Sequence, residues 1–352
     1  LSSPDGRLKV DVVPCGTHLE YSLTCDGDTL VAPSPISMTL SDGTTLPSGK
    51  LLKTRRNSVN GTVSTPFYRK ADVPDRYNEL SLVYGGSKVS FRLFDNAFAW
   101  RFEAGKRRSY KVMSEQVSFN FPDDWTTYAT YTHKHENNGL EAQFCDDFEN
   151  VYEHVRLSEL DASHFITTPM MVEGPKGVKM VITESDVVSY PGLFLYKGAG
   201  LHSLEGRNAP VPSELKVGGH NGLQELVNAR HNYIAACDGN ARTFPWRVMC
   251  ISREDRDMAD NDAVFLLGPK PDPKADFSWV KPGRVAWEWL NNWGLKGKDF
   301  MPGVNTPTYK CYIDFASAHG LEYVILDEGW AVKGKNDLLA VVPEIDLEEI
   351  VG

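Results

Sequence analysis

Two short segments near the end of the chain carry residues that could do chemistry together. "WEWLNNW" (287–293) sets tryptophans beside a glutamate and asparagines, and "DEGW" (327–330) sets adjacent carboxylates before Gly and Trp. Aromatic faces stack on the C–H surfaces of a sugar, while carboxylates and amides hydrogen-bond its vicinal hydroxyls. We therefore predict a carbohydrate pocket, with these candidate ligands: Trp287, Asn291, Trp293, Asp327, Glu328 and Trp330.

The adjacent acids are poorly suited to act together as a catalytic pair. Glycoside hydrolysis uses two carboxyl groups about 5 to 5.5 Å apart for retention, or about 6.5 to 9.5 Å apart for inversion. Asp327 and Glu328 are neighbours on an extended segment, so their side chains point to opposite sides. We expect each to bind hydroxyls or to be one half of a pair. The alternative is that the tryptophans pack a domain interface and the acids are solvated loop residues.

Two other segments offer possible metal ligands. In "MVITESDVVSYPG", Glu184 and Asp186 follow an apolar run, where a carboxylate could hold a hard cation such as calcium. A turn-capping acid is the alternative. His133 and His135 are also spaced to share a metal, but no third ligand is evident, so a surface loop is favoured.

The cysteines give no metal-binding spacing. None of the six forms a CxxC pair, which argues against a zinc site: Cys15, Cys25, Cys145, Cys237, Cys250 and Cys311. Cys15 and Cys25 flank a predicted hairpin and could pair in an oxidising compartment. Two free thiols are the favoured alternative.

Composition narrows the class of protein. The 352 residues carry a formal net charge of −10 with both signs interspersed, and the pI is about 5.4. This balance argues against nucleic acid and anionic membrane as partners. No apolar run approaches the roughly 18 residues that span a bilayer. The start "LSSPDGRLKV" lacks Met and a signal peptide, so we expect it to result from processing or truncation.

Residues 1–270 are predicted to form one antiparallel β-sandwich domain. Short segments such as "RLKVDVV", "KVSFRLFDNAFAWRFEA" and "WRVMCIS" alternate or run apolar between Asp-Gly and Asp-Asn turns. Many strands without a long amphipathic helix indicate a large sandwich. The Pro- and Lys-rich residues 271–281 are predicted to be a linker.

Residues 282–352 change to an α/β pattern. We predict buried strands at "GRVAWEWL" and "YVIL", with a helix between them whose buried face carries Tyr309, Tyr312, Ile313 and Ala316. Thr306 is the predicted N-cap, Pro307 the first helical residue and Gly320 the end of that helix. Asp346 and Glu349 predict a capping box for a second helix. A complete eight-stranded barrel takes about 250 residues. We therefore expect a fragment holding only the first two βα units of a truncated (β/α)8 TIM barrel.

The ordered segments resemble one known family. "SSPDGRLKVDV", "FRLFDNAFAWRF", "VITESDVVSYPGLFL", "PGRVAWEWLNNWG" and "YVILDEGW" are similar to glycoside hydrolase family 97, bacterial α-glycosidases of the starch-utilisation type. The resemblance implies an N-terminal β-supersandwich, a catalytic (β/α)8 barrel and a C-terminal β-domain.

The resemblance also implies a function. It predicts an exo-acting, calcium-assisted α-glycosidase in which Glu184 is a Ca2+ ligand and Asp327 hydrogen-bonds the bound sugar. The catalytic carboxylates would lie beyond Gly352, so this chain alone would be inactive. Terminal α-linked glucose is placed first as substrate; the alternatives are a retaining α-galactosidase and a non-catalytic carbohydrate-binding sandwich. The expected partner is an oligosaccharide, the expected location periplasmic or extracellular, and the expected state monomer or homodimer.

Overall fold

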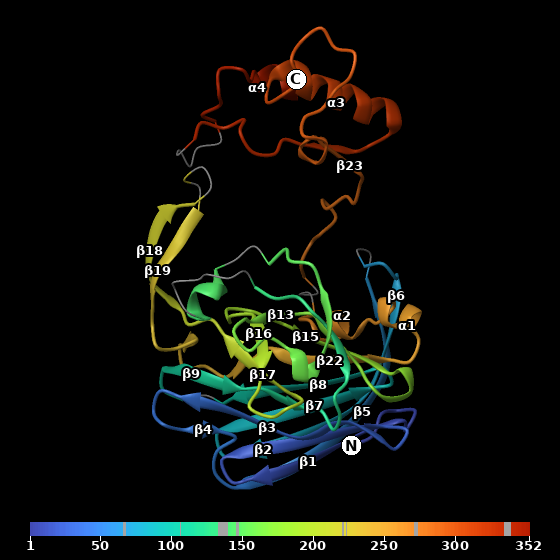
Figure 1. Cartoon of the computed structure of the whole chain (residues 1–352), viewed down its shortest axis with the longest axis vertical. Coiled ribbons are helices and arrows are strands. Elements are labelled where there is room, and N and C mark those ends of the chain that lie inside the picture. Colours follow the sequence, from blue (N-terminus) through green and yellow to red (C-terminus); the bar gives the residue numbers. More distant parts are fainter. Residues whose placement is uncertain are drawn as a thin grey trace. The chain divides into compact units, whose positions relative to one another are not determined.

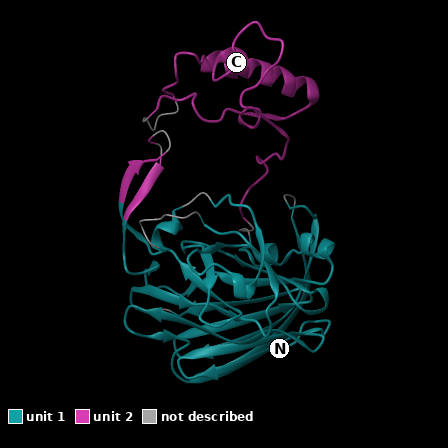
Figure 2. Cartoon of the chain, in the orientation of Figure 1, with its two compact units in different colours: residues 1–214, 229–270 teal, residues 215–228, 271–352 magenta. Residues whose placement is uncertain are grey.

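The computed structural model describes residues 1–65, 68–105, 107–132, 140–145, 148–219, 222, 224–270, 274–333 and 339–352. The chain divides into two compact units, coloured separately in Figure 2. The first unit holds residues 1–214 and 229–270, and the second holds residues 215–228 and 271–352. The predicted domain ranges, 1–270 and 282–352 with a linker at 271–281, stay a prediction.

The first unit contains two ten-stranded sheets, visible as stacked layers in Figure 1. All of the strand pairs described within them are antiparallel. The first sheet contains β1 (Leu8–Cys15), β2 (His18–Cys25), β3 (Asp28–Leu40), β4 (Thr45–Leu46), β9 (Tyr110–Gln116), β10 (Ser118–Asn120), β13 (Ile166–Thr167), β16 (Leu193–Lys197), β17 (Ser203–Asn208) and β20 (Ala235–Cys237).

The second sheet is built largely from neighbouring hairpins. It contains β5 (Leu51–Ser64), β6 (Asp72–Tyr84), β7 (Ser87–Phe94), β8 (Ala97–Ala104), β11 (Thr126–Ala129), β12 (Glu153–Arg156), β14 (Met170–Glu173), β15 (Lys179–Ser185), β21 (Arg242–Thr243) and β22 (Trp246–Ser252). The predicted strands in "RLKVDVV", "KVSFRLFDNAFAWRFEA" and "WRVMCIS" are confirmed.

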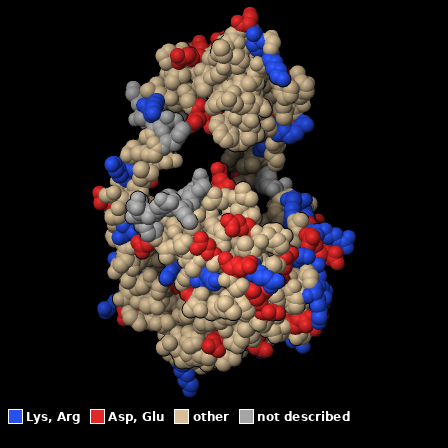
Figure 3. Space-filling model, in the orientation of Figure 1, with Lys and Arg blue, Asp and Glu red and all other residues tan. Residues whose placement is uncertain are grey.

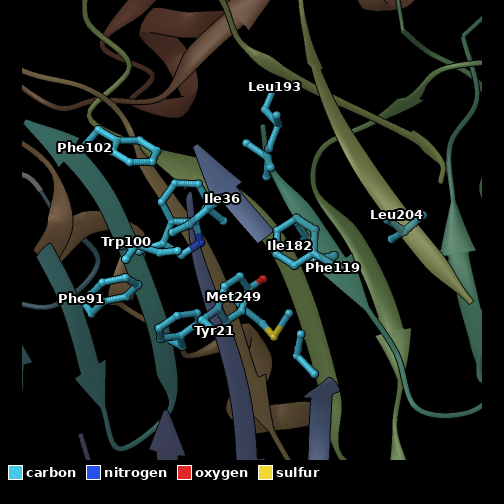
Figure 4. Close-up of a cluster of buried hydrophobic side chains, with 14 of the residues drawn as sticks. Tyr21, Ile36, Phe91, Trp100, Phe102, Phe119, Ile182, Leu193, Leu204 and Met249 are labelled. Atoms are coloured by element: carbon cyan, nitrogen blue, oxygen red, sulfur yellow. The ribbon is translucent and has the colours of Figure 1, made fainter. Parts of the chain in front are cut away.

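One core joins the two sheets. Tyr21 and Ile36 from the first sheet meet Phe91, Trp100 and Met249 from the second in a single cluster of buried side chains (Figure 4). Each of these large side chains contributes roughly 1.5 to 3 kcal/mol by leaving water. The period-2 alternation seen in the sequence supplies these inward-facing residues, so the predicted sandwich is confirmed.

Short helices complete the first unit and were not predicted. The helices α1 (Asp255–Ala259) and α2 (Ala263–Leu267) follow β22. Ala263 and Leu267 of α2 cover the outer face of the second sheet, where they pack in a cluster with Phe94 and Trp246. Single 3-10 turns occur at η1 (Leu140–Phe144), η2 (Leu157–Glu159) and η3 (Pro175–Gly177).

The second unit contains a parallel βαβ arrangement. Strands β23 (Val285–Trp287) and β24 (Tyr323–Ile325) pair in parallel, and α3 (Thr306–His319) connects them. A 3-10 turn, η5 (Trp289–Asn291), follows β23, and α4 (Leu347–Val351) lies near the chain end. Within the described residues no further strand joins β23 and β24, so a barrel stays a prediction. The pair β18 (Pro212–Gly218) and β19 (Gln224–Arg230) forms a separate two-stranded sheet.

Several local predictions for the second unit are wrong. The strand expected over "GRVAWEWL" ends at Trp287, because the Glu288 carbonyl accepts the N–H groups of Asn291 and Trp293 and closes a turn. Both expected strands are only partly covered: Val285, Tyr323 and Ile325 are each more than two-fifths exposed. These strands have one paired neighbour each, whereas a strand inside a complete parallel sheet has two.

The third wrong prediction is the N-cap of α3. Asn305 caps the helix, its side chain accepting a 3.0 Å hydrogen bond from the Thr308 N–H, and Thr306 is the first helical residue. Tyr309, Tyr312 and Ala316 are buried as predicted, but Ile313 is only half-buried, and Thr306 and Thr308 are buried as well.

The predicted end of α3 is confirmed, and the predicted start of α4 is confirmed in part. Gly320 ends α3 with φ near +66°, the left-handed conformation that glycine adopts without strain. The Asp346 carboxylate accepts the Glu349 N–H at 2.9 Å and caps α4. The Asp346 N–H donates to Thr306 Oγ1 at 2.7 Å, and the Glu349 carboxylate pairs with Lys310, so the predicted capping box does not form.

The surface carries both signs of charge. On the face of the first unit seen in Figure 3, lysine and arginine side chains are interspersed with aspartate and glutamate side chains and form no large patch of one sign.

In the described ranges, every helix is too short or too polar to span a membrane.

Candidate active site

The end of β23 and the loop after β24 meet through a tryptophan and a carboxylate. The Trp287 indole N–H donates a 2.6 Å hydrogen bond to Asp327 Oδ2, and Asp327 Oδ1 accepts the Glu328 N–H at 2.7 Å. Because β23 and β24 are parallel and in register, their carboxyl ends lie at one edge. Two of the predicted ligands, Trp287 and Asp327, are therefore brought together.

A buried glutamate lies directly beneath this pair. Glu288 is fully buried, and its Oε1 accepts hydrogen bonds from the Tyr309 hydroxyl at 3.1 Å and from the Asp327 N–H at 2.8 Å. Burial, chiefly, raises the pKa of Tyr309, with the Glu288 carboxylate adding to the shift. Glu288 therefore fixes the backbone of Asp327 and keeps the Tyr309 hydroxyl protonated as a donor.

The turn after β23 exposes an aromatic surface. Asn292 and Trp293 both adopt positive φ, near +50°, which reverses the chain after η5. Trp287 and Trp289 stack with ring centroids 5.6 Å apart and planes 22° apart, and Trp289 is about half exposed. Such a pair offers a flat apolar face next to the Asp327 carboxylate, the combination that a sugar ring requires.

The other predicted ligands lie less close to this pair. Asn291 is exposed on η5, and Trp330 is half-buried with its carbonyl accepting the Val342 N–H at 3.0 Å. Trp293 is half-buried and bonds through its backbone to Glu288. Among the described hydrogen bonds, none joins the side chain of Asn291, Trp293 or Trp330 to Asp327. Glu328 follows Asp327 in the chain, and its backbone N–H donates to Asp327 Oδ1.

The sequence prediction noted a glutamate at the end of the first strand, Glu288, and placed Tyr309 on the buried face of the helix, but it did not predict that the two meet. Both signals were present: alternation places Glu288 on the same side of the chain as buried Ala286, and Tyr309 is on the predicted buried face of α3. A carboxylate on a buried face beside a tyrosine on the covering helix indicates a buried hydrogen bond, because a charge seldom stays unpaired there.

Glu184, the predicted metal ligand, belongs to an ionic cluster in the first unit. Its Oε1 accepts the Leu193 N–H at 2.9 Å, and its Oε2 contacts Arg247 Nη1 at 2.5 Å. Glu184 on β15 and Arg247 on β22 are direct cross-strand partners. The fully buried Arg247 also binds Glu115 through two nitrogens, and the Tyr190 hydroxyl donates to Glu115 at 3.0 Å.

The cluster carries an excess of formal negative charge. Burial by itself lowers the pKa of Arg247. The carboxylates of Glu115 and Glu184 have the larger effect, so the pKa of Arg247 is raised above its ordinary value. Two carboxylates face one guanidinium, so one negative charge is not balanced within the cluster. The neighbouring Asp186 is paired with Arg101 at 3.0 Å. Glu184 is therefore a structural ion-pair partner, not a simple turn cap.

These residues supply only part of the set of ligands that Ca2+ requires. Ca2+ takes about six to eight oxygen ligands, and within the described ranges no group of three ligating side chains surrounds Glu184. Glu184 keeps lone pairs beyond its two hydrogen bonds and lies in a cluster with spare negative charge. It can supply one ligand but not a site, so we derive no catalytic step through calcium. His133 and His135 lie outside the described residues.

A cavity of about 330 Å³ in the first unit reaches the Glu115 end of this cluster. Phe144 and Phe165 line it together with Glu115, Arg207 and Asn208. It combines aromatic faces with charged and amide groups, and no sequence pattern predicted it.

The six cysteines are free thiols. Cys15 pairs with His18 and Cys25 with Leu8, so the two thiols lie at opposite ends of the β1–β2 hairpin. A disulfide needs Cα atoms closer than about 7 Å, and the favoured prediction of free thiols is confirmed.

Family models match nearly the whole chain. One described as "Glycosyl-hydrolase 97 N-terminal" matches residues 1–269, and one described as "Glycoside hydrolase 97" matches residues 287–352.

Curated relatives match all or nearly all of the chain. A "Retaining alpha-galactosidase" of Bacteroides thetaiotaomicron is 44% identical over 353 residues, covering 100% of this chain and 53% of the relative. A "Probable retaining alpha-galactosidase" of Streptomyces bingchenggensis is 25% identical over 338 residues, covering 94% of this chain and 45% of the relative. The chain spans about half the length of these curated relatives.

Solved structures share the fold. A glycoside hydrolase family 97 enzyme from Pseudoalteromonas sp. strain K8, in complex with acarbose, aligns with a TM-score of 0.72 and 22% identity, over 96% of this chain and 48% of that chain. A beta-arabinopyranosidase aligns with a TM-score of 0.71 and 23% identity, over 95% of this chain and 51% of that chain. At these identities the likeness extends to the fold alone.

Proposed function

Because the chain belongs to glycoside hydrolase family 97, we propose that the protein releases terminal α-linked galactose from oligosaccharides with retention of anomeric configuration. One observation carries this proposal: the 44% identity to a retaining α-galactosidase over the complete chain. The sequence prediction placed α-linked glucose first and galactose second. The names of the two curated relatives favour the galactosidase alternative.

Sugar binding is the role that the geometry of the second unit supports. The stacked Trp287 and Trp289 present an apolar face, and Asp327 presents a carboxylate whose position is fixed by Trp287 and Glu288. In this proposal Asp327 accepts hydrogen bonds from vicinal sugar hydroxyls. Asn291, Trp293, Glu328 and Trp330 are retained as proposed ligands.

The proposal assigns no proton donor or nucleophile to this chain. Retention requires a carboxylate that attacks the anomeric carbon and an acid that protonates the leaving oxygen, about 5 to 5.5 Å apart. Asp327 is already held by the Trp287 indole, and Glu288 is buried under it. The parallel βαβ unit supports the further proposal that the chain opens a (β/α)8 barrel, whose later strands carry these two groups.

The test compares two substrates on the full-length gene product. We expect p-nitrophenyl α-galactoside to be hydrolysed with a much larger kcat/KM than p-nitrophenyl α-glucoside. Proton NMR of the first turnover should show the α-anomer of galactose as the initial product. A preference for the glucoside would restore the α-glucosidase alternative, and a β-anomer would exclude the retaining mechanism.

Calcium assistance is a separate part of the proposal. Glu184 supplies one oxygen ligand, and the excess negative charge of its cluster favours a cation. Glu184→Gln in the full-length protein should lower calcium affinity measured by calorimetry, whereas Glu115→Gln, which disturbs the same arginine, should lower it less. Equal affinities in wild type and Glu184→Gln would remove Glu184 from the ligand set.

A non-catalytic binding module is less well supported. Such a module needs an exposed aromatic platform on the sandwich, and in the described part of the first unit Tyr152 is the one aromatic among the exposed large hydrophobic side chains. We propose a periplasmic or extracellular location, which cell fractionation with an antibody to the protein would test.

A further inference from the structure

The β1–β2 hairpin brings together three side chains that ligate metals. One ligand atom each from Cys15, His18 and Glu20 lies within 4.8 Å of the others. The His18 Nε2 and Glu20 Oε1 atoms are 3.6 Å apart. The sequence argued against zinc because no CxxC spacing occurs, but the hairpin replaces that spacing with cross-strand pairing. Nothing in the proposed glycosidase function uses these residues.

The strand register explains why the three groups meet. Cys15 is directly opposite His18 across a two-residue turn, and Glu20 is diagonal to Cys15 on the same face. The alternate residues Leu19, Tyr21 and Leu23 face the core and are fully buried, so His18 and Glu20 must point outward. Side chains opposite each other in an antiparallel pair have Cβ atoms about 4.5 to 5.5 Å apart. The backbone of the hairpin therefore fixes the cluster.

We propose that Cys15, His18 and Glu20 form a surface site for a zinc-like divalent metal ion. Zn2+ favours this set of sulfur, imidazole nitrogen and carboxylate oxygen, with ligand distances of about 2.0 to 2.3 Å. Tetrahedral ligands are then about 3 to 4 Å from one another, so small side-chain rotations close the site. The fourth position is left for water. Hard ions such as Ca2+ are disfavoured, because they take oxygen ligands.

Metal binding changes the proton balance at Cys15. The metal binds the thiolate, so the S–H proton passes to solvent as the metal–sulfur bond forms. The bound ion joins β1 to β2 at the edge of the first sheet and stabilises the turn between them.

The test uses the 352-residue chain and two metals. Cobalt(II) in place of zinc should give a thiolate-to-metal charge-transfer band that saturates at one equivalent. Zinc calorimetry in buffers of different ionisation enthalpy should show proton release on binding. Cys15→Ser should abolish the cobalt band and lower zinc affinity by at least about 100-fold, since even outer-shell partners are worth about 10- to 100-fold.

Matched variants separate this site from other binding. His18→Gln and Glu20→Gln should each weaken zinc binding, while Cys145→Ser, at an exposed thiol elsewhere, should not. His133→Gln with His135→Gln should also leave the cobalt band unchanged. The proposal is overturned by the absence of a thiolate band, or by equal zinc affinity in wild type and Cys15→Ser. Zinc should raise the melting temperature of wild type but not of Cys15→Ser, and an equal rise in both would likewise contradict it.

Discussion

Arg247 joins two carboxylates inside the first unit. It is fully buried and binds Glu115 and Glu184, so its removal would leave both acids without their cation. We predict that Arg247→Met lowers the free energy of unfolding by about 3 to 5 kcal/mol, the usual cost of breaking a buried pair. Urea denaturation measures this change.

The control for this prediction is Arg256, whose side chain is 85% exposed and whose pair with Asp257 spans 3.7 Å. Arg256→Met should change the free energy of unfolding by no more than about 0.5 kcal/mol. Adding Glu115→Gln and Glu184→Gln to Arg247→Met should recover part of the loss. A further loss instead would show that charge imbalance is not the cause.

Glu288 is predicted to hold the Asp327 loop through one oxygen. Glu288→Ala leaves the Tyr309 hydroxyl and the Asp327 N–H without an acceptor, which costs about 1 to 3 kcal/mol for a buried group. Hydrogen exchange at the Asp327 amide should accelerate accordingly. Glu348→Ala, on the exposed side of α4, serves as the control and should leave that amide protected.

Asp161 is expected to make the first unit less stable at acid pH than at neutral pH. Hydrogen bonds from the Ser163 hydroxyl, foremost, and then from the Ser163 N–H and His164 lower the pKa of Asp161 from 3.8 to about 2. The folded state therefore binds fewer protons than the unfolded chain in this window. The stabilisation is complete above about pH 4 and is lost as the pH falls toward about 2.

The prediction for Asp161→Asn follows from this sign. Its melting temperature should lie below that of wild type at neutral pH, and the difference should shrink between about pH 4 and pH 2. Thermal unfolding monitored by circular dichroism across that range measures the effect. A difference that stays constant with pH would assign the loss to packing.

At the scale of the element, the first turn of α3 depends on Asn305. Its side chain accepts the Thr308 N–H, and losing an N-cap costs about 0.5 to 2 kcal/mol. Asn305→Ala should therefore speed hydrogen exchange of the amides at residues 308–310. Asn305→Asp keeps the acceptor and should have a smaller effect. Equal effects of the two variants would contradict a capping role.

Local sequence patterns predicted some elements well and others poorly. The hairpins of the first unit were predicted because alternation and turn residues are recorded in neighbouring positions, as in β7 and β8. The strand ending at Trp287 was predicted too long, because its end depends on the Glu288 carbonyl bonding to Asn291 and Trp293. The chain after Trp287 can form either this turn or a longer paired strand, and which of the two forms depends on the strands that lie next to β23.

At the scale of the whole molecule, we predict that residues 1–352 alone do not turn over a glycoside. The chain spans about half the length of its curated relatives, and no catalytic pair is assigned within it. Both this chain and the full-length gene product should be assayed with p-nitrophenyl α-galactoside. Turnover by the shorter chain above the buffer rate would place a complete catalytic pair within these residues.

The same assay needs a control for folding. If the short chain is folded but inactive, its near-ultraviolet circular dichroism should show ordered tryptophans and its thermal transition should be cooperative.

Asp327 provides a test of the proposed sugar pocket. Asp327→Asn in the full-length protein should raise KM for the galactoside, because it alters a proposed hydroxyl ligand. An unchanged KM would remove Asp327 from the proposed pocket.

The sandwich, the change to an α/β pattern after the predicted linker and the family were all predicted from the sequence, because periodicity, turn residues and ordered motifs are properties of neighbouring positions. The tertiary structure decided which side chains meet. Trp287 with Asp327, Arg247 with its two acids, and Cys15 with His18 and Glu20 are set by strand register and helix packing. "DEGW" shows the limit: its carboxylates were visible in the chain, but the partner of Asp327 lies 40 residues away. Such contacts depend on long-range pairing, which no local pattern records.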